Sequence, residues 1–541
     1  MQVLELLFRQ LKLRGLAIVL LSGLTALARI MAIEICGSAT RDGLSRALEF
    51  HRLVLLVLTV VLFVLASRYT FRLVSSCLNR GVEGVVVRLV ALFANADLAK
   101  LERLGLPDVG VKVFRESGAL RRLHYSVALG FFRAVFIVLI LAYVLYKSLT
   151  IGAIVLGLLG TVVLFLGRWR EGAAASLDET ADSESRSHQL LEQLIQGFAA
   201  VKLHRPRSQA LLGALHASFT ERKRSRGSVA KFFHDQRFVV ETWLYLPLGL
   251  VVYISIDLLN LPRDVVLEVA LAMVFLFRSL ILSLEEAPKL ILANQSVATL
   301  SDLEQQLVRC QPVTPSPDRE KKTDFGREFE SLDLRDVTLS VSDAGGHEVF
   351  DLRIDQFRLN AGEVVFLVGE NGSGKSTLLT LLAGLYEPTT GEIRLNDRIV
   401  RVGDRRGYRE WVAAVWADPW LFEREYGAVE PKESEVAHWL KTFGLEGITA
   451  YERDGFTARS LSTGQRQRLA LVSALMQRRP VLLLDEWTAG HDPGCVEQFY
   501  RHILPELRAR GLTVVMAHHD QEYEVFADRV LRLKEGRVTT E

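Results

Sequence analysis

The sequence predicts an α-helical membrane domain of six spans, followed by an α/β P-loop domain. Three observations support this fold class. Apolar segments long enough to cross a bilayer fill the N-terminal half. A stretch rich in proline and charge follows, Gln311–Glu328. Beyond it, strand and helix patterns alternate around the phosphate-loop motif GENGSGKST, which predicts a mostly parallel sheet covered by helices.

The composition limits the number of domains and the class of partner. A chain of 541 residues is too long for one hydrophobic core, so two or more domains are expected. The net charge is only +2, which argues against a nucleic-acid partner. Hydrophobic residues make up 49% of the chain and are concentrated in its first half. The four cysteines have no metal-ligand spacing and are expected to be free thiols: Cys36, Cys77, Cys310 and Cys495.

The apolar segments give the predicted spans, since a crossing takes about 20 residues. A cleaved signal peptide is the alternative reading of the first segment. Its apolar run is longer than a signal core and no small-residue cleavage site clearly follows, so an uncleaved span is favoured. The spans are Leu16–Cys36, Leu53–Leu73, Ser126–Tyr146, Leu149–Leu166, Phe238–Leu259 and Val265–Leu284.

Basic residues between the spans predict the orientation. Polar helical stretches rich in Arg and Lys, such as Glu221–Gly227, separate the second span from the third and the fourth from the fifth. The positive-inside rule places them in the cytoplasm, and an even number of crossings then leaves both termini there. The expected domains are a membrane domain at 1–310, a linker at 311–330 and a nucleotide-binding domain at 331–541.

The phosphate-loop motif follows a predicted buried strand, Glu363–Gly369, and opens a predicted helix, Lys375–Gly384. This is the context in which the motif binds phosphates, because glycines let backbone N–H groups converge at a helix N-terminus. Lys375 is expected to contact the β- and γ-phosphates of ATP, and Ser376 to offer its hydroxyl to Mg²⁺. The predicted phosphate-binding set is Gly369, Asn371, Gly372, Gly374, Lys375, Ser376 and Thr377.

Two carboxylates follow the apolar run VLLLD. Asp485 ends this predicted strand, so we expect it to hold Mg²⁺ through a water molecule beside the phosphate loop. Glu486 is the expected general base, which polarises the attacking water.

The stretch LSTGQRQR, Leu461–Arg468, resembles the signature motif of ATP-binding-cassette (ABC) proteins through Ser462, Gly464 and Gln465. The resemblance implies a membrane domain of the type I ABC exporter kind. In that family the motif reaches over the nucleotide held by a second copy of the domain. It therefore implies a homodimer in which each ATP lies between Lys375 of one chain and Ser462 of the other.

The same resemblance extends to two further motifs. AGHDP is similar to the D-loop and contributes Asp492. MAHHDQ carries the switch histidine, which contacts the γ-phosphate and positions the water. His519 is preferred because the family pattern places this histidine directly before an acidic residue, here Asp520. His518 remains the alternative.

The last third resembles a narrower branch, the cyclic-peptide exporters that include the pyoverdine-precursor and syringomycin exporters. The markers are Trp487 after the carboxylate pair and the helix Phe499–Gly511. This implies ATP- and Mg²⁺-dependent export of a cyclic peptide, a peptide siderophore precursor or a similar amphipathic compound. It also implies a lipid-embedded protein in the cytoplasmic (inner) membrane of a bacterium.

Three positions depart from the family pattern. Ala417 replaces the glutamine that touches Mg²⁺ and senses the membrane half, and an alanine cannot ligate a metal. Val341 stands where an adenine-stacking aromatic is expected, which predicts weaker base stacking. His491 is a smaller departure in the D-loop.

Charged residues fall within or near the predicted spans, where they are costly and usually face a cavity. Arg29, Arg133 and Arg278 predict a partly cationic substrate cavity, whereas snorkelling or pairing with a glutamate of another helix is the alternative for Arg29 and Glu34. Segments 96–106 and 200–208 are expected to include the short coupling elements of the family that dock on the ATPase.

Two other functions share most of these features. A flippase for lipids or lipid-linked glycans has the same architecture, although the surroundings of Trp487 disfavour it. A nucleotide-gated receptor or channel with little turnover is consistent with Ala417 and Val341. The intact set of Lys375, Asp485, Glu486 and His519 opposes that second alternative.

Overall fold

The computed structural model describes residues 14–38, 46–104, 106–122, 124–257, 262–312, 325–342, 348–427, 432–453, 455–457, 460–519 and 521–540. The chain forms two compact units. The first comprises Met1–Leu89 and Val111–Leu303, and the second comprises Val90–Gly110 and Glu304–Glu541. Most of the predicted linker, residues 313–324, lies outside the described residues, and strand β1 begins at Ser331.

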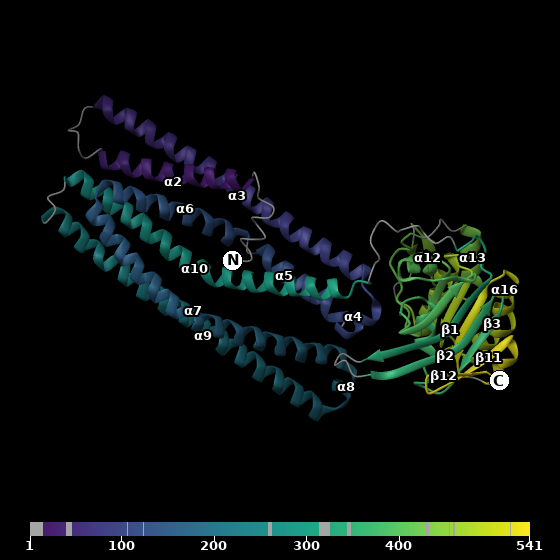
Figure 1. The fold of residues 1–541 in the computed structure, drawn as a ribbon. Coiled ribbons are helices and arrows are strands. Elements are labelled where there is room, and N and C mark those ends of the chain that lie inside the picture. Colours follow the sequence, from purple (N-terminus) through teal and green to yellow (C-terminus); the bar gives the residue numbers. More distant parts are fainter. Residues whose placement is uncertain are drawn as a thin grey trace. The chain divides into compact units, whose positions relative to one another are not determined.

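The first unit is built from long helices (Figure 1). All six predicted spans lie in helices, except that the end of the fifth, at 258–259, falls outside the described part of the chain. Helix α7 has 48 residues and α9 has 53, about 70–80 Å of helix. Each can cross a hydrocarbon core of about 30 Å and continue into the basic polar stretches. The bounds are α2 Arg14–Ser38, α3 Arg46–Asn95, α5 Leu106–Arg122, α6 His124–Lys147, α7 Leu149–Gln196, α8 Phe198–Leu203, α9 Arg205–Asp257 and α10 Arg263–Arg309.

Three of these helices are long and apolar enough to cross a membrane within the described ranges: Ala17–Cys36, Phe50–Asn95 and Arg263–Glu286. A shorter apolar helix covers Leu149–Val162. A core of buried side chains from α2, α6, α7, α9 and α10 holds the unit together. These apolar helices indicate an integral membrane protein, and the count of six crossings stays a prediction.

The second unit contains a ten-stranded sheet with the order β5-β4-β1-β2-β12-β11-β3-β10-β9-β6, counted over the described residues. Strands β11, β3, β10, β9 and β6 are parallel. Strands β1, β2, β4 and β5 pair antiparallel, so the sheet is mixed rather than mostly parallel. The bounds are β1 Ser331–Ser342, β2 Glu348–Asn360, β3 Val364–Val368, β4 Thr390–Leu395, β5 Arg398–Ile399, β6 Val412–Val415, β9 Val481–Asp485, β10 Thr513–His518, β11 Arg529–Lys534 and β12 Arg537–Thr540; β7 Tyr451–Glu452 and β8 Gly455–Phe456 form a separate pair.

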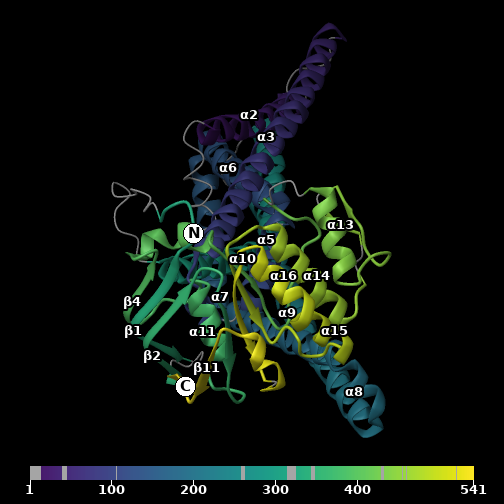
Figure 2. The ribbon, with the colours of Figure 1, turned by 90° about the vertical axis from the view of Figure 1, so that its right-hand side faces the viewer.

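The two faces of the sheet carry different helices. Side chains alternate along a strand, so Phe366 of β3 points to one face and Leu367 to the other. The Phe366 face packs against α13 Glu433–Thr442, α14 Thr463–Met476, α15 Pro493–Gln498, η3 Phe499–Ile503 and α16 Leu504–Ala509, which gather together in Figure 2. The Leu367 face packs against α11 Lys375–Leu382, α12 Arg405–Arg409 and strands β1, β2 and β4. Helices α11 and α14 therefore lie on opposite faces of the sheet.

Candidate nucleotide-binding site

The phosphate loop connects β3 to α11. Gly374 has a φ of +104°, and an added Cβ would meet the Phe350 ring at 2.6 Å, so only glycine fits there. Lys375 is 4% exposed, and its Nζ donates hydrogen bonds to the carbonyl oxygens of Gly369 at 2.8 Å and Glu370 at 3.0 Å. Burial lowers the pKa of this amine. The loop thus holds a desolvated cation against its own carbonyl groups.

The two carboxylates lie at the same edge of the sheet. Asp485 ends β9, is 6% exposed, and accepts a hydrogen bond from Ser376 Oγ at 3.0 Å. Burial raises the pKa of Asp485, against the opposing effect of that hydrogen bond. Glu486 adopts a φ of +49°, a left-handed backbone conformation that residues other than glycine rarely take. Its N–H donates to Ala517 O at 3.0 Å.

The two candidate switch histidines occupy different environments. His518 is the last residue of β10, is 1% exposed, and packs its ring 4.6 Å from the centroid of Phe366. His519 lies beyond the strand, is exposed, and places Nε2 2.8 Å from Glu486 Oε1. The contact of His519 with the predicted general base favours it as the switch histidine. Asp520, the basis of the sequence argument, is outside the described residues.

The predicted signature residues form the N-terminus of α14. Ser462 is the N-cap: its Oγ accepts from Gln465 N at 3.3 Å, and its own N–H donates to Gln465 Oε1 at 3.0 Å. This capping box fixes where the helix begins. Ser462 is exposed, and α14 packs on the face of the sheet opposite to α11. The signature and the phosphate loop of one chain therefore belong to different layers.

Trp487 and His491 connect the end of β9 to the signature helix. Trp487 is fully buried, and its Nε1 donates to Gln467 O on α14 at 3.1 Å. The His491 ring stacks on it at 4.6 Å, and His491 Cδ2 would lie 3.8 Å from a Cβ added at Gly464. Burial lowers the pKa of His491. Asp492, the D-loop residue, caps α15 by accepting from Cys495 N at 3.0 Å.

The two larger departures from the family pattern lie close to other parts of the site. Ala417 is exposed after β6, and its carbonyl accepts from Gln467 Nε2 at 3.0 Å. Val341 of β1 pairs with Phe350 of β2, whose ring reaches Gly374 of the phosphate loop. An aromatic ring is therefore present beside the loop, one strand away from the predicted position. Phe350 could not be predicted from the sequence, because only the β1–β2 register places its ring there.

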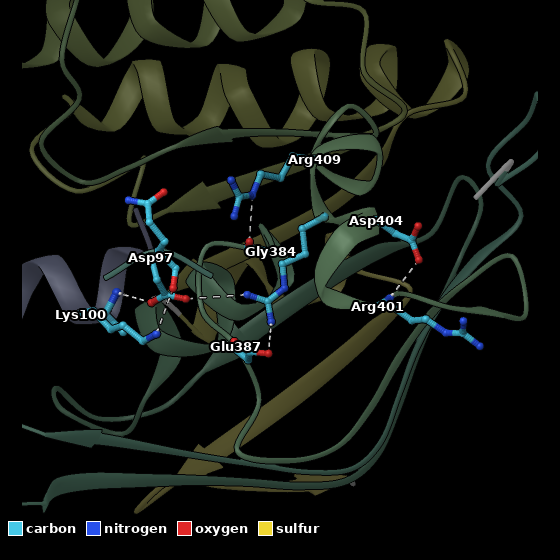
Figure 3. Close-up of polar contacts among 10 residues, drawn as sticks. Asp97, Lys100, Gly384, Glu387, Arg401, Asp404 and Arg409 are labelled. Carbon is cyan, nitrogen blue, oxygen red and sulfur yellow. Dashed lines mark hydrogen bonds and ion pairs between the residues drawn. The ribbon is translucent and has the colours of Figure 1, made fainter. Parts of the chain in front are cut away.

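The segment 90–110 belongs to the same unit as the sheet, and helix α4, Leu98–Leu104, forms its centre. Asp97 is nearly buried and lies 3.8 Å from Arg405 Nη1, while Arg405 Nη2 pairs with Glu387 at 3.0 Å. Glu102 accepts from Tyr386 OH at 2.8 Å. Figure 3 shows Asp97 beside the loop that carries Glu387, near the hydrogen bond from Arg409 Nε to Gly384 O.

This cluster, Asp97–Arg405–Glu387 with Glu102–Tyr386, ties α4 to the segment directly after the phosphate-loop helix. The short helix expected in 96–106 is present as α4, and that expected near 200–208 is α8. The cluster residues themselves were not predicted, since their partners lie about 300 positions away along the chain.

The charged residues of the membrane segments are arranged differently from one another. The Arg29 Cζ lies 4.5 Å from the centroid of the Phe63 ring. Arg133 Nη1 donates to Leu282 O at 2.6 Å. Arg278 is exposed on α10 and has no hydrogen bond, ion pair or ring contact with another described residue. Glu34 pairs with Lys147 at 3.4 Å rather than with Arg29.

The four expected thiols are free cysteines in the structure.

Comparison with known proteins identifies the second unit. Residues 352–489 match the ABC transporter family model. The lipoprotein-releasing ATP-binding protein LolD 1 of Rhodospirillum rubrum is 33% identical over 229 residues, 38% of this chain and 97% of the relative. The ATP-binding protein SyrD of Pseudomonas syringae pv. syringae is 36% identical over 235 residues.

The match to SyrD spans 43% of this chain and 42% of SyrD's own length, less than half of that relative. In structure, the chain resembles a bacterial Atm1-family ABC exporter with ATP bound, with a TM-score of 0.75 and 18% identity over 98% of this chain and 94% of that one. The likeness shows the exporter-type fold. The chain belongs to the ABC transporter family.

Proposed function

We propose that this protein is an ATP-driven exporter that works as a homodimer with two composite ATP sites. It moves a cyclic peptide, a peptide siderophore precursor or a similar amphipathic compound out of the cytoplasm, through six spans in a bacterial inner membrane. The main observation in favour of ATP hydrolysis is the contact of His519 with Glu486 beside the phosphate loop. The similarity to SyrD and the buried Trp487 support the substrate class.

The residues of the loop fit a magnesium–nucleotide complex. Lys375 and Asp485 are both buried. Burial lowers the pKa of Lys375 and raises that of Asp485, so it favours the neutral form of each group. A cation beside Asp485 and phosphates beside Lys375 would stabilise the charged form of each group against its burial. Ser376 Oγ and Asp485, the latter through water, would hold Mg²⁺, which supplies neutralisation of phosphate charge. The phosphates would lie on Gly369, Asn371, Gly372, Gly374, Lys375, Ser376 and Thr377.

The hydrolytic step uses Glu486 and His519. A water oxygen bonds to the γ-phosphorus as the bond to the β–γ bridging oxygen breaks, and the water proton passes to Glu486. Nε2 of His519 is already placed at Glu486 Oε1, so this pair can align the water and contact the γ-phosphate. The partner's Ser462, Gly464 and Gln465 close the site from the other side, with Asp492 at the interface. The products are ADP and inorganic phosphate.

The substrate path is proposed to include Arg29, Arg133 and Arg278. A partly cationic path suits an acidic amphipathic compound, because an ionised residue within a span requires a partner or water. The α4 cluster around Asp97 and Arg405 would transmit ATP-driven closure to the membrane helices as a coupling element. The Glu486–His519 contact opposes a binding-only receptor or channel.

The proposal is tested by ATPase activity of the full chain in lipid nanodiscs. The protein is assayed alone and with a panel of cyclic peptides, acyl-peptide siderophore precursors and lipid-linked sugars. Stimulation by a peptide supports the exporter assignment and identifies the substrate class. Stimulation by lipid-linked sugars alone would replace it with a flippase, and absence of turnover despite bound ATP would contradict both.

Phe350 is expected to take over part of the base contact that Val341 does not supply. Replacing Phe350 with Ala should weaken ATP binding about tenfold, since stacking on an aromatic ring contributes about 1–3 kcal/mol per base. Phe350→Tyr keeps the ring and should retain affinity. The measurement is calorimetric titration with ATP and with inorganic tripolyphosphate. Tripolyphosphate has no base. An equal loss of affinity for tripolyphosphate would show that Phe350 only packs against Gly374.

A further inference from the structure

Arg29 lies in the apolar part of α2, with its guanidinium close to two phenyl rings. Its Cζ is 4.5 Å from the ring centroid of Phe63 on α3 and 4.8 Å from that of Phe136 on α6. Both distances are within the range of a cation–π contact. A guanidinium carries five N–H donors, more than two aromatic rings can accept. The rings therefore hold Arg29 in place, and its guanidinium can still donate to another group.

A second cation lies beside the first. Arg133 is three residues before Phe136 on α6, so the two share one face of the helix. Arg29 and Arg133 are close enough for their like charges to interact. Arg133 Nη1 is bonded to Leu282 O on α10 at 2.6 Å, and its charge also acts on Glu286. Two repelling cations among apolar helices make the space between them favourable for an anion.

The described part of the chain supplies no carboxylate to Arg29. The nearest acid along α2 is Glu34, which pairs with Lys147 at 3.4 Å. Lys147 in turn bonds to the buried Glu268 at 2.8 Å, so this acid is also engaged. A charged side chain within a membrane segment is costly without a counter-charge or water. An anionic group of a bound molecule would supply this counter-charge.

We propose that Arg29 and Arg133 form a subsite for the anionic headgroup, carboxylate or phosphate, of an amphipathic molecule. The planar N–H edge of Arg29 matches two oxygens of such a group. The apolar tail would lie along α3, where Val60 and Val64 are about half exposed next to Phe63. The subsite deepens the proposed export function, on which it rests for the role of its ligand. Exported acidic lipopeptides and membrane lipids share this headgroup chemistry.

The test measures binding to the full chain in zwitterionic phosphatidylcholine nanodiscs. The probes are radiolabelled N-lauroyl-glutamate and its uncharged dimethyl ester. The wild type should prefer the acid, and Arg29→Gln should weaken binding of the acid at least about tenfold while leaving the diester unchanged. Arg29→Lys keeps the charge and should keep the preference for the acid, which separates lost charge from lost folding. Arg68→Gln, at an exposed arginine on α3, is the matched control and should have no effect.

Added phosphatidylglycerol distinguishes the two sources of the headgroup. If this lipid competes with the probe in the wild type but not in Arg29→Gln, the ligand is a lipid; if it does not compete, the ligand is a solute. Equal binding of acid and diester by the wild type, or unchanged binding of the acid in Arg29→Gln, would overturn the subsite. Failure of ATP-driven transport with the acid preference intact would contradict export and leave the subsite standing.

Discussion

Replacing Glu486 with Gln is expected to lower the turnover number for ATP hydrolysis about 10²–10⁴-fold, the contribution typical of a general base. The amide has the shape of the carboxylate and can still bond to His519 Nε2, which lies 2.8 Å from Glu486 Oε1. It cannot accept the water proton. ATP affinity should therefore remain near the wild-type value while phosphate release slows to the same extent as turnover. Steady-state phosphate release and equilibrium ATP binding, measured on the same preparation, check both parts.

Glu535→Gln provides the matched control for this substitution. Glu535 has the same φ of +49° as Glu486 and is exposed in the turn between β11 and β12. The same chemical change at the same backbone conformation should leave turnover unchanged. Turnover in Glu486→Gln within a few-fold of the wild type would exclude Glu486 as the base. A parallel loss of ATP binding would instead indicate damage to the phosphate loop.

Mixed dimers should reveal that each ATP site is built from two chains. Lys375→Ala disables the phosphate loop. Ser462→Asp keeps a good helix N-cap but places a carboxylate against the phosphates. A dimer that pairs one chain of each kind has one site with both defects and one intact site. It should occlude about one nucleotide per dimer, because the intact site holds its ligand through a direct charge contact.

The control dimer pairs a wild-type chain with one that carries both changes. With sites shared between chains, each of its two sites contains one defect, so neither should occlude nucleotide. Vanadate trapping on dimers purified through two different tags gives the stoichiometry. If the control dimer occluded about one nucleotide and the first dimer occluded none, the signature would contact the nucleotide held by its own chain. That result would also conflict with the position of α11 and α14 on opposite faces of the sheet.

The features predicted correctly from sequence are those that depend on a few consecutive residues. The phosphate loop falls between β3 and α11 because a buried strand, a glycine-rich turn and a helix follow one another in the chain. Asp485 and Glu486 reach the same edge because parallel strands end there together. The helical segments were also predictable, since apolar runs of this length have few alternatives.

The features that were missed depend on contacts between distant segments. The proximity of Phe350 to Gly374 requires the register of the β1–β2 pair, which no local pattern encodes. The assignment of 90–110 to the sheet's unit depends on contacts such as Glu102–Tyr386, across the boundary expected from chain order. Arg29 was a candidate from its charge alone, and its two aromatic neighbours emerge only when α2, α3 and α6 pack.

ATP-dependent uptake into inverted proteoliposomes tests the central claim, that this chain moves an amphipathic peptide away from the cytoplasmic side. Vesicles with the nucleotide-binding side outward receive a labelled acyl-peptide siderophore precursor or cyclic lipopeptide. We expect accumulation inside that requires ATP and Mg²⁺, disappears in Glu486→Gln and persists in Glu535→Gln. ATP hydrolysis without accumulation of any peptide in the panel, or accumulation that survives in Glu486→Gln, would contradict it.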